Sequence, residues 1–522
     1  MKRIIAILLI CFMCFNLPVG GFAAETAELP DDFVAIISTL NGLGIMEKAE
    51  LSQESYSRSV SRGEFARHLL ALIKVREYDE GVTFSDMPAS HTYAGELGTA
   101  YNMGLLVAAN GKIRPDDAIT CGEALQAAVT LLGAATVPAS PAVSQNDYIR
   151  QAVKMEIVRK IVPGKNILTY AQFVEILYNS LLAETAYILP NQEELVKSNC
   201  LLTSCWGLSM DEGFVTANQY YSLTESRGTE SACVIINGHS YKVEDYIDIE
   251  CVGLMVRYFY DNDGTIVAME KKKHEKEVIS SLDLISMSTL NEIRTSGGKI
   301  DYYESDREKN SLKLSNEAYI LKNYEAAAPD EVAIPENGEV ILLDYNRDKN
   351  FDVVLINEYT ELVMSQMNVE TGFIMGKGGK NINFDKDTVL VYNNGVIGSI
   401  EDITSGKTLS ACCNDEGLAR TIYVAQGAVE GMLSAISDED VTIRGRSYKL
   451  SGAFSRDYVI KLGDSGIFYL NHRGEIAYFV SDDTSFRYGY LMGIGTEGAV
   501  SKKVLMKVLT KDEGIVIFNV RD

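Results

Sequence analysis

The 522-residue chain is short of positive charge, and this shortage excludes one large class of function. It has 48 Lys and Arg against 72 Asp and Glu, which gives a formal net charge of −24. Nucleic-acid binding requires a basic face that neutralises phosphates, so we expect no nucleic-acid partner. The acidic balance fits a soluble extracellular protein, or one whose carboxylates meet divalent cations.

Long hydrophobic runs are also scarce. The only long one lies at the start, where Lys2 and Arg3 precede an apolar stretch over residues 4–15 and small residues follow before Glu25. This layout is that of a secretory signal peptide, which we expect to span residues 1–24. An uncleaved anchor helix is disfavoured because the run is shorter than about 18 residues. We therefore predict a secreted protein with no transmembrane span after signal cleavage.

Cysteine, histidine and catalytic motifs offer little chemistry. Removing Cys11 and Cys14 of the signal segment from a total of nine cysteines leaves seven, an odd number at irregular spacing that is not typical of a disulfide framework. The five histidines lie far apart with no metal-ligand spacing. No G-x-S-x-G, H-E-x-x-H or Walker pattern occurs. We therefore predict that the chain is not an enzyme and assign no catalytic residue.

The length exceeds what one hydrophobic core usually holds, which predicts several domains. In the first part, the stretch "IRPDDAITCGEAL" (113–125) has the spacing of a helix capping box. The same spacing occurs three times, in Ser61 with Glu64, Thr120 with Glu123, and Thr169 with Gln172. After each cap, positions +4, +8 and +12 are apolar, which indicates one buried helix face.

Each capped helix is preceded by another apolar-periodic segment, so we expect a repeat of helix, loop and capped helix. A pair of short helices cannot bury its own apolar face, and stacked copies that share one core are the physical solution. We predict an all-α pseudo-trimer with repeats at residues 25–80, 81–137 and 138–185.

The second repeat, "FSDMPASHTYAGELGTAYNMGLLVAANGKIRPDDAITCGEA", resembles the S-layer homology (SLH) modules of bacterial surface proteins. It follows the family's F-x-D opening, its G-[IL]-[LV] tripeptide, the G-x-[IF]-x-P loop and the T-R-A-E cap. The resemblance covers about 160 residues and is closest in this repeat. It implies a trimer of modules that holds a protein on the cell wall by gripping an acidic, often pyruvylated, secondary wall polysaccharide.

The resemblance also implies which residues contact the polymer, namely Arg62, Glu64, Asp86 and Tyr93. The arginine of T-R-A-E supplies a cationic fork that suits a carboxylate. Arg62 fills that slot in the first repeat, whereas Cys121 and Tyr170 fill it in the second and third. We therefore expect Arg62 to bind the polymer and the other two slots to be disabled. The alternative is that the capping residues only cap helices.

From about residue 186 the sequence changes to short alternating runs that are typical of antiparallel β modules. The segments "INGHSYKV" (236–243) and "IRGRSYKL" (443–450) share one pattern, and a hairpin of the form Asx-x-x-Gly follows each. We predict a duplicated small barrel or sandwich. The expected β modules span residues 186–285, 286–365, 366–427 and 428–522, the last being incomplete.

One loop is a candidate metal site. Its alternating oxygen side chains could converge on a structural Ca²⁺, with Asn350 offering its backbone carbonyl. The residues are Asp344, Asn346, Asp348, Asn350 and Asp352. An EF-hand is disfavoured because Lys349 and Leu355 occupy the positions that require Gly and Glu. A polar hairpin tip without an ion is the alternative.

Together these patterns predict a multidomain α + β protein of the cell surface, with helical repeats followed by β modules. We expect it to be secreted, anchored non-covalently to a secondary cell-wall polysaccharide, and to display the β modules in a structural or adhesive S-layer role that includes self-assembly. Two alternatives remain. The β region could be an accessory region of a carbohydrate-active or peptidoglycan-active enzyme, or degenerate SLH repeats could mediate assembly without binding wall polymer.

Overall fold

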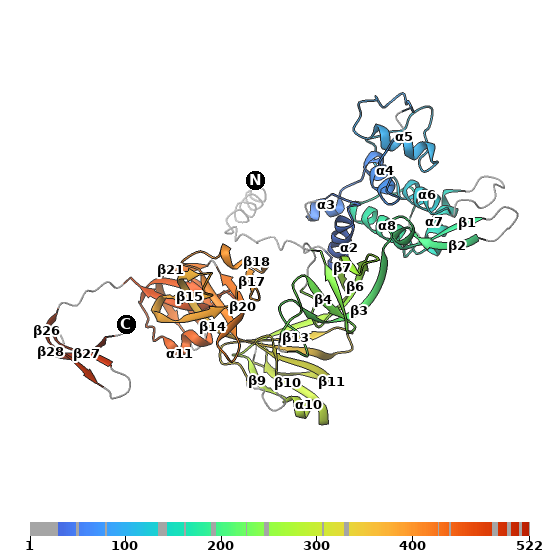
Figure 1. The fold of residues 1–522 in the computed structure, drawn as a ribbon. Helices are drawn as coiled ribbons and strands as arrows, with labels where there is room; N and C mark the ends of the chain where they lie inside the picture. The colour runs from blue at the N-terminus through green and yellow to red at the C-terminus, as the bar shows by residue number, and fades with distance from the viewer. Residues whose placement is uncertain are drawn as a thin grey trace, which may run out of the picture. The chain divides into compact units, whose positions relative to one another are not determined.

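A computed structural model of the chain divides into two compact units, which are described separately (Figure 1). The first comprises Met1–Met210 with Tyr258–Glu270, and the second comprises Asp211–Arg257 with Lys271–Asp522. The structure describes residues 30–47, 52–78, 81–133, 144–160, 163–188, 195–225, 227–244, 250–304, 307–327, 334–425, 427–437, 440–482, 489–497, 503–510 and 514–520. The predicted signal peptide lies outside these ranges.

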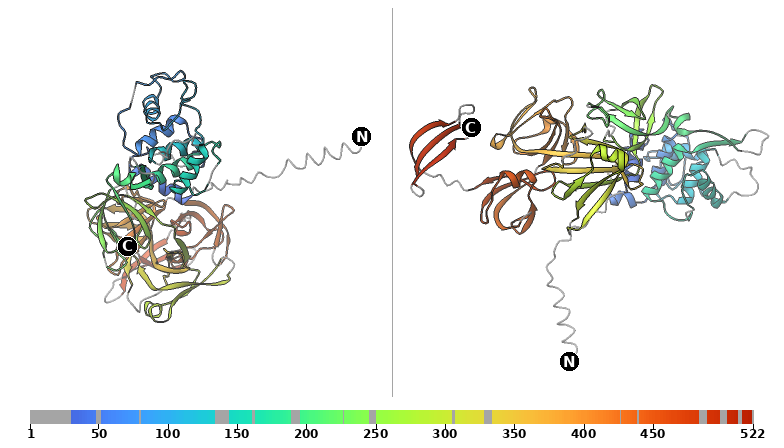
Figure 2. Two further views of the ribbon diagram at one scale, coloured as in Figure 1. Left: turned by 90° about the vertical axis from the view of Figure 1, so that its right-hand side faces the viewer. Right: turned by 90° about the horizontal axis from the view of Figure 1, so that it is seen from below.

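The first unit is mainly helical, and its helices cluster together in both views of Figure 2. In chain order they are α2 (Asp31–Gly42), α3 (Gln53–Ser57), α4 (Arg62–Ala71), α5 (Ala94–Asn102), α6 (Cys121–Leu131), α7 (Gln145–Lys154), α8 (Tyr170–Leu182) and α9 (Leu201–Ser204). A two-stranded antiparallel sheet of β1 (Glu184–Ile188) and β2 (Leu195–Cys200) follows α8. The predicted order of helix, loop and capped helix is present three times, as α2–α4, α5–α6 and α7–α8.

The three capped helices form as the sequence predicts, with one difference. Thr120 and Thr169 each form a complete capping box. Ser61 accepts the amide of Glu64, but the Glu64 carboxylate binds the guanidinium of Arg58 instead of returning to the cap. The ion pair competes for that carboxylate, so the predicted capping box is only half formed here.

The apolar positions after the caps lie inside one core shared by all three helix pairs. Phe65, Ala124 and Phe173 are fully buried, and so are the positions four residues later in each helix. Burying a residue such as Leu or Phe contributes about 1.5–3 kcal/mol relative to exposure. This shared core explains why the short helices are stable together.

Short backbone bridges tie the three repeats into a closed ring. Ser61 pairs with Ala118, Thr120 with Ile167, and Ser59 with Thr169. Each repeat therefore pairs with both others through the segment just before its capped helix.

The chain after α9 consists mainly of β-strands, and the first five of these form a barrel. The barrel is closed in the order β3-β4-β5-β7-β6. Its strands are β3 (Ser209–Asn218), β4 (Cys233–Ile236), β5 (His239–Val243), β6 (Met255–Tyr260) and β7 (Thr265–Lys271).

A 13-stranded sheet follows the barrel along the chain. Its strands are β8 (Glu275–Ser280), β9 (Leu284–Met287), β10 (Gly298–Tyr303), β11 (Lys309–Lys322), β12 (Glu325–Ala326), β13 (Gly338–Asp344), β14 (Asn350–Asn368), β15 (Phe373–Gly376), β16 (Asn381–Phe384), β17 (Leu390–Asn393), β18 (Val396–Gly398), β19 (Thr408–Cys413) and β20 (Leu418–Ala425), with α10 (Leu290–Ser296), η1 (Lys377–Gly379) and η2 (Ile400–Asp402) between them. The predicted module boundary at 365/366 falls inside β14.

Two smaller sheets complete the chain. The first has five strands, β21 (Ala428–Ile436), β22 (Asp440–Ile443), β23 (Arg446–Lys449), β24 (Ser465–Leu470) and β25 (Ile476–Ser481), with α11 (Gly452–Asp457) after β23. The second has three, β26 (Gly489–Glu497), β27 (Lys503–Thr510) and β28 (Gly514–Val520). No helix in the described part of the chain is long and apolar enough to cross a membrane.

The two predicted copies share one strand-pairing pattern, although only the first is a closed barrel, and the same pattern occurs in two further five-strand modules. In each copy the first strand pairs with the fourth, the second with the third, and the fourth with the fifth. The copies are β3–β7; β8, the end of β11, β12, β13 and the start of β14; the end of β14, β17, β18, β19 and β20; and β21–β25.

The turn between the second and third strands is the same in all four copies. Both central residues have positive φ, which matches the twist of a two-residue hairpin. These pairs are Asn237-Gly238, Asn323-Tyr324, Asn394-Gly395 and Arg444-Gly445.

A backbone contact recurs as well. In copies one, three and four, one residue of the first strand donates its amide to the carbonyl of the residue just before the fourth strand. The carbonyl of the same first-strand residue accepts the amide of a glycine. The three glycines are Gly253, Gly406 and Gly463.

The expectation of purely antiparallel modules was wrong at three strand pairs. β11 pairs with β14, β16 with β20, and β17 with β20 in parallel. In copies two and three the fifth strand pairs with the second, and the chain between them crosses over instead of forming a hairpin. Parallel pairing requires such a crossover.

Candidate functional site

The best-defined sites in the first unit lie at the three places where neighbouring repeats meet. We call the contact between repeats one and two the first junction, that between two and three the second junction, and that between three and one the third junction. At each junction, the residue directly after one helix cap approaches the third residue of the next capped helix. The pairs are Arg62 with Glu123, Cys121 with Gln172, and Tyr170 with Glu64.

The first junction is a filled, charged contact. The Arg62 side chain is 1% exposed, and its Nη1 lies 2.6 Å from Oε1 of Glu123. Its Nε donates to the carbonyl of Ile113 at 2.8 Å, and its Nη2 donates to that of Val107 at 3.0 Å. Arg114 Nη2 reaches the same Glu123 oxygen at 2.7 Å and is 44% exposed. Arg62 therefore braces the loop of the second repeat, and Arg114 is the exposed cation of this junction.

Electrostatics agree with a structural ion pair. Burial by itself raises the pKa of Glu123, but the Thr120 amide and the guanidiniums of Arg62 and Arg114 outweigh that effect, so the pKa of Glu123 lies below its usual range. Breaking a buried pair by removing one partner typically costs about 3–5 kcal/mol.

Asp86 and Tyr93 support the same junction. Asp86 accepts the backbone amides of Ile113 and Arg114 at 3.0 and 2.8 Å, which fixes the loop that Arg62 contacts. Tyr93 packs against Gly63 so closely that a Cβ on Gly63 would lie 2.3 Å from Cδ2 of Tyr93. The structure thus brings Arg62, Asp86 and Tyr93 together around one junction, and places the fourth predicted residue, Glu64, elsewhere.

Glu64 belongs to the third junction. Arg58 Nη1 donates to Glu64 Oε2 at 2.9 Å, and the Arg58 guanidinium lies 4.1 Å above the ring of Tyr170. The backbone amide of Tyr170 donates to the carbonyl of Arg58 at 2.8 Å. At the third junction, the ring of Tyr170 under the Arg58 guanidinium therefore takes the place that Arg62 has at the first junction.

The second junction is open. A pocket of about 170 Å³ lies beside Cys121 and is lined by Cys121, Val158, Arg159, Lys160, Leu168, Gln172, Glu175 and Ile176. The Cys121 thiol contacts Oε1 of Gln172 at 3.8 Å, and burial raises its pKa. A thiol with a raised pKa is a poor nucleophile, so the pocket, and not the cysteine's reactivity, is the feature of interest.

Comparison of the two junctions explains the pocket. Glu123 and Gln172 are each the third residue of a capped helix. Val107 and Arg159 each follow a corresponding tripeptide, Gly104-Leu105-Leu106 and Glu156-Ile157-Val158, whose first residue has positive φ in both. The pocket wall therefore contains the counterparts of the groups that hold Arg62. A cysteine in the arginine slot leaves that space open to solvent.

Arg159 and Lys160 are both exposed. Neither has an ion-pair partner within the described ranges. The helix α6 begins at Cys121, so the positive end of its dipole also lies at the pocket. Sequence reasoning missed these two cations because it considered only the arginine slot of the cap.

The predicted calcium loop joins β13 to β14. Asp344 is fully buried, and its two carboxylate oxygens accept the amides of Arg347 and Lys349 at 2.6 and 2.8 Å. Asn346 accepts the amide of Asp348, and Asp348 accepts that of Asn350. Among the residues that the structure describes, no group of three or more His, Cys, Asp or Glu side chains is arranged to hold a metal. Calcium binding by this loop stays a prediction.

The fifth residue of that loop, Asp352, is nearly buried. Its Oδ2 accepts the amide of Tyr345 at 3.3 Å. Burial raises the pKa of Asp352 to about 6, and the charges of Asp344 and Asp348 add to the increase.

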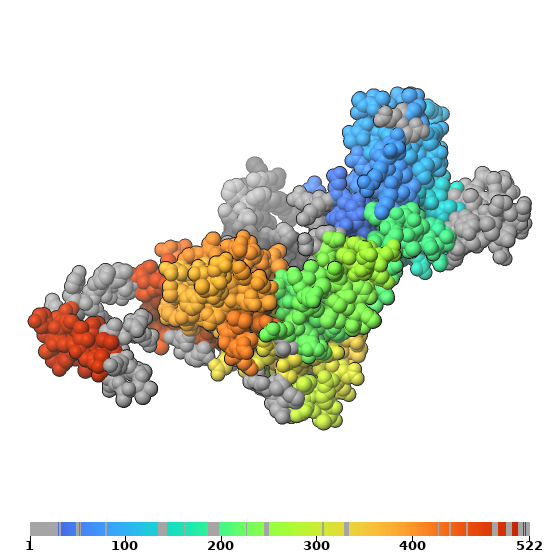
Figure 3. All heavy atoms as spheres, in the orientation of Figure 1, coloured from blue at the N-terminus to red at the C-terminus, as the bar shows by residue number. Residues whose placement is uncertain are grey.

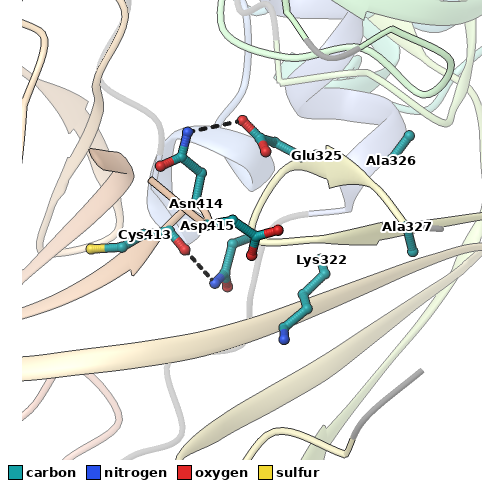
Figure 4. Close-up of a pocket in the computed structure, with 8 residues that line it drawn as sticks. Lys322, Glu325, Ala326, Ala327, Cys413, Asn414 and Asp415 are labelled. Atoms are coloured by element: carbon teal, nitrogen blue, oxygen red, sulfur yellow. Dashed lines mark hydrogen bonds between the residues drawn. The ribbon is translucent and has the colours of Figure 1, made fainter. Parts of the chain in front are cut away.

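A second, smaller pocket of about 50 Å³ lies in the β region, between the turn after β11 and the end of β19. Figure 4 shows the Asn414 side chain donating to Glu325, at 3.2 Å, beside Cys413 and Asp415. Asn323 bridges the same two segments through the carbonyl of Cys413 at 2.6 Å. These bonds join copies two and three of the module, and we assign no function to this pocket.

Comparison with known proteins gives distant relatives. The chain is 21% identical over 482 residues to a "Cell surface protein" of Thermoanaerobacter kivui, covering 86% of this chain and 57% of that protein. It is 25% identical over 163 residues to "Exoglucanase XynX" of Acetivibrio thermocellus, covering 28% of this chain and 15% of the enzyme. The chain thus spans a little over half of the first relative and a small part of the second. No family model matches.

Among solved structures, "drosophila Unr CSD456" aligns with 41% of this chain and 100% of its own, at 10% identity and a TM-score of 0.15. The similarity over most of the chain to a bacterial cell-surface protein indicates a surface-located protein. The described fold is mixed α and β with mostly β content.

Proposed function

We propose that the helical unit holds the protein on the bacterial cell wall by binding an acidic wall polymer, and that the β modules are displayed as a structural or adhesive surface. The helical repeats are then degenerate SLH modules. Three features support this proposal: the T-R-A-E-like caps, the closed ring of three repeats and the similarity to a cell-surface protein over 86% of the chain.

The observation that carries the proposal is the pocket of the second junction. Its rim has two exposed cations, Arg159 and Lys160, and it lies at the N-terminal end of α6. A carboxylate of a sugar acid fits between two such cations, and the dipole of α6 favours the same negative charge. The first junction is filled by Arg62 itself, so there the exposed Arg114 is the cation that remains for a polymer.

Arg62, Asp86 and Tyr93 act in this proposal by shaping the first junction, and Glu64 by holding Arg58 over Tyr170. This differs from the role that the resemblance implies for Arg62, because a side chain that is 1% exposed and bound to three acceptors has little surface left for a ligand.

The test is co-sedimentation of the mature chain with wall sacculi that retain their polysaccharide. The variant Arg159→Ser with Lys160→Ser removes two cations at the pocket, and Arg76→Ser with Lys154→Ser removes two exposed cations elsewhere on the same unit. We expect at least a tenfold loss of bound protein for the first pair and little change for the second. Equal binding by both pairs would exclude the second junction as the site.

A further inference from the structure

The fourth β module contacts the sheet before it through a hairpin whose tip is exposed in the first and third copies. This hairpin, residues 471–475, joins β24 to β25. In the first and third copies, the equivalent tips carry Asn262 and Asp263 or Asp415 and Glu416, and all four residues are exposed. In the fourth copy, the equivalent residues His472 and Arg473 are half-buried, and the flanking Asn471 and Glu475 are buried, at 3% and 7% exposure.

The buried residues of the hairpin bind polar groups of the neighbouring module. Asn471 Nδ2 donates to Oε1 of Glu361, on β14, at 2.8 Å and to Oε2 of Glu475 at 2.9 Å. Arg473 Nη2 lies 2.7 Å from the same Glu475 oxygen, and its Nη1 donates to the carbonyl of Gly338. One guanidinium and one amide thus connect Glu475 of the hairpin with Glu361 of β14 and a backbone carbonyl of β13.

Aromatic rings complete the contact. The His472 ring stacks on Tyr423 of β20, with centroids 4.4 Å apart and planes at 15°, and meets Tyr359 of β14 edge-on at 5.0 Å. The Arg473 guanidinium lies 5.1 Å from the centre of the Tyr359 ring. Asn471, His472 and Arg473 therefore each have a specific partner on the preceding sheet.

The two modules have separate hydrophobic cores. One apolar cluster consists of residues between Leu362 and Val424, and the other of residues between Leu433 and Ile476. The facing surface of the sheet is polar, with Asn357, Glu361 and Ser410 all buried. Contact between the modules consequently depends on directional polar bonds, which fix one orientation but contribute little if misaligned.

We propose that the 471–475 hairpin is a polar lock that holds the third and fourth β modules as one body. The body it creates comprises the described residues between 359 and 482, coloured orange to orange-red in Figure 3. Opening the lock frees the fourth module without unfolding either core, because each module keeps its own apolar cluster.

The decisive variant is Asn471→Asp. The Asn471 Oδ1 accepts the amides of Arg473 and Glu475, and an aspartate keeps this cap of the turn. The same change removes the Nδ2 donor and places a third carboxylate against Glu361 and Glu475. The variant therefore weakens the contact with Glu361 and Glu475 while the hairpin keeps its turn. Asp261→Asn, at the equivalent position of the exposed first-copy hairpin, is the matched control.

Amide hydrogen exchange of the full mature chain, followed by mass spectrometry, gives the readout. We expect Asn471→Asp to raise exchange at least tenfold in residues 357–361 and 471–476, with β22 and β16 as protected as in wild type. The control should match wild type throughout. Unchanged exchange in Asn471→Asp would overturn the proposal, and so would loss of protection across β22 and β16, since the lock would then be inseparable from the cores.

Discussion

Arg62 and Glu123 meet across the first repeat junction, with 2.6 Å between Nη1 and Oε1, although 61 positions separate them in the chain. The counterparts of this pair at the second junction are Cys121 and Gln172, and a pocket lies between them. Two changes, cysteine for arginine and glutamine for glutamate, therefore separate a braced junction from an open one.

Replacing Arg62 with Ala should destabilise the helical unit by about 3–5 kcal/mol, because it leaves two loop carbonyls without their donor and removes one of the two guanidiniums that bind Glu123. Urea unfolding of the mature chain measures the loss. Arg58→Ala is the control, since the exposed pair of Arg58 with Glu64 should contribute at most about 1 kcal/mol. Similar losses for the two variants would contradict the bracing role of Arg62.

The second junction should accommodate an arginine–glutamate pair like that of the first junction. Combining Cys121→Arg with Gln172→Glu recreates the buried pair, and the double-mutant cycle should give a coupling of about 2 kcal/mol in favour of the pair. The double variant should also lose binding to wall polymer, because the new side chain fills the pocket. A coupling near zero would show that the two junctions are not equivalent.

Acid should weaken the polar lock. Burial, with the nearby charge of Arg473, lowers the pKa of His472 to about 3, whereas an exposed histidine has a pKa of about 6.5. The open form therefore binds a proton more readily, so the lock is fully present above about pH 6.5 and is lost as the pH falls towards 3.

Other groups around His472 bear on this pH dependence. The rings of Tyr359 and Tyr423 contact the His472 ring, and the Arg473 charge acts on it. One shell further out, Tyr392 stacks on Tyr423, Glu339 and Cys412 lie beside Tyr359, and Glu361 and Glu475 bind Asn471. Burial also raises the pKa of Cys412 and Tyr423, so these stay neutral in acid. His472→Phe keeps a stacking ring without a proton site. We expect its thermal midpoint to exceed wild type increasingly from pH 7 to pH 5; parallel pH profiles would exclude His472 as the sensitive group.

Asp352 gives a pH dependence of opposite sign. A folded pKa of about 6 means that the ionised carboxylate opposes folding, a cost that is absent below about pH 4 and complete above about pH 6. Asp352→Asn should therefore stabilise the protein by about 1–3 kcal/mol at pH 7 and leave it unchanged at pH 4. Thermal melting at the two pH values measures this difference.

The predicted calcium site would include the same carboxylate. If the loop from Asp344 to Asp352 holds Ca²⁺, millimolar calcium should raise the melting temperature of wild type more than that of Asp352→Asn. No shift of the wild-type melting temperature at millimolar calcium would reject the predicted structural site.

The sequence predicts the helical part well because its signals are local. Caps such as Thr120 with Glu123 and the apolar spacing after them depend on residues within one turn or one face of a helix. The position of Arg62 could not be read in this way. Its partners come from another repeat, and only the fold shows that its side chain is buried.

In the β region, two of the four module copies were found from their shared turn pattern. The other two were missed because insertions separate their strands, as β15 and β16 do in the third copy. In the second copy, in addition, Tyr324 occupies the turn position that Gly395 occupies in the third. The polar lock at Asn471 was invisible for a different reason. Its hairpin has the same Asx-x-x-Gly pattern as the exposed hairpins, and only long-range packing buries it.

The most direct test of wall anchoring is co-sedimentation of the mature wild-type chain with bacterial sacculi, before and after chemical removal of the wall polysaccharide. We predict that the protein sediments with intact sacculi and stays in the supernatant with stripped ones. Failure to sediment with either preparation, or equal sedimentation with both, would contradict anchoring through an acidic wall polymer.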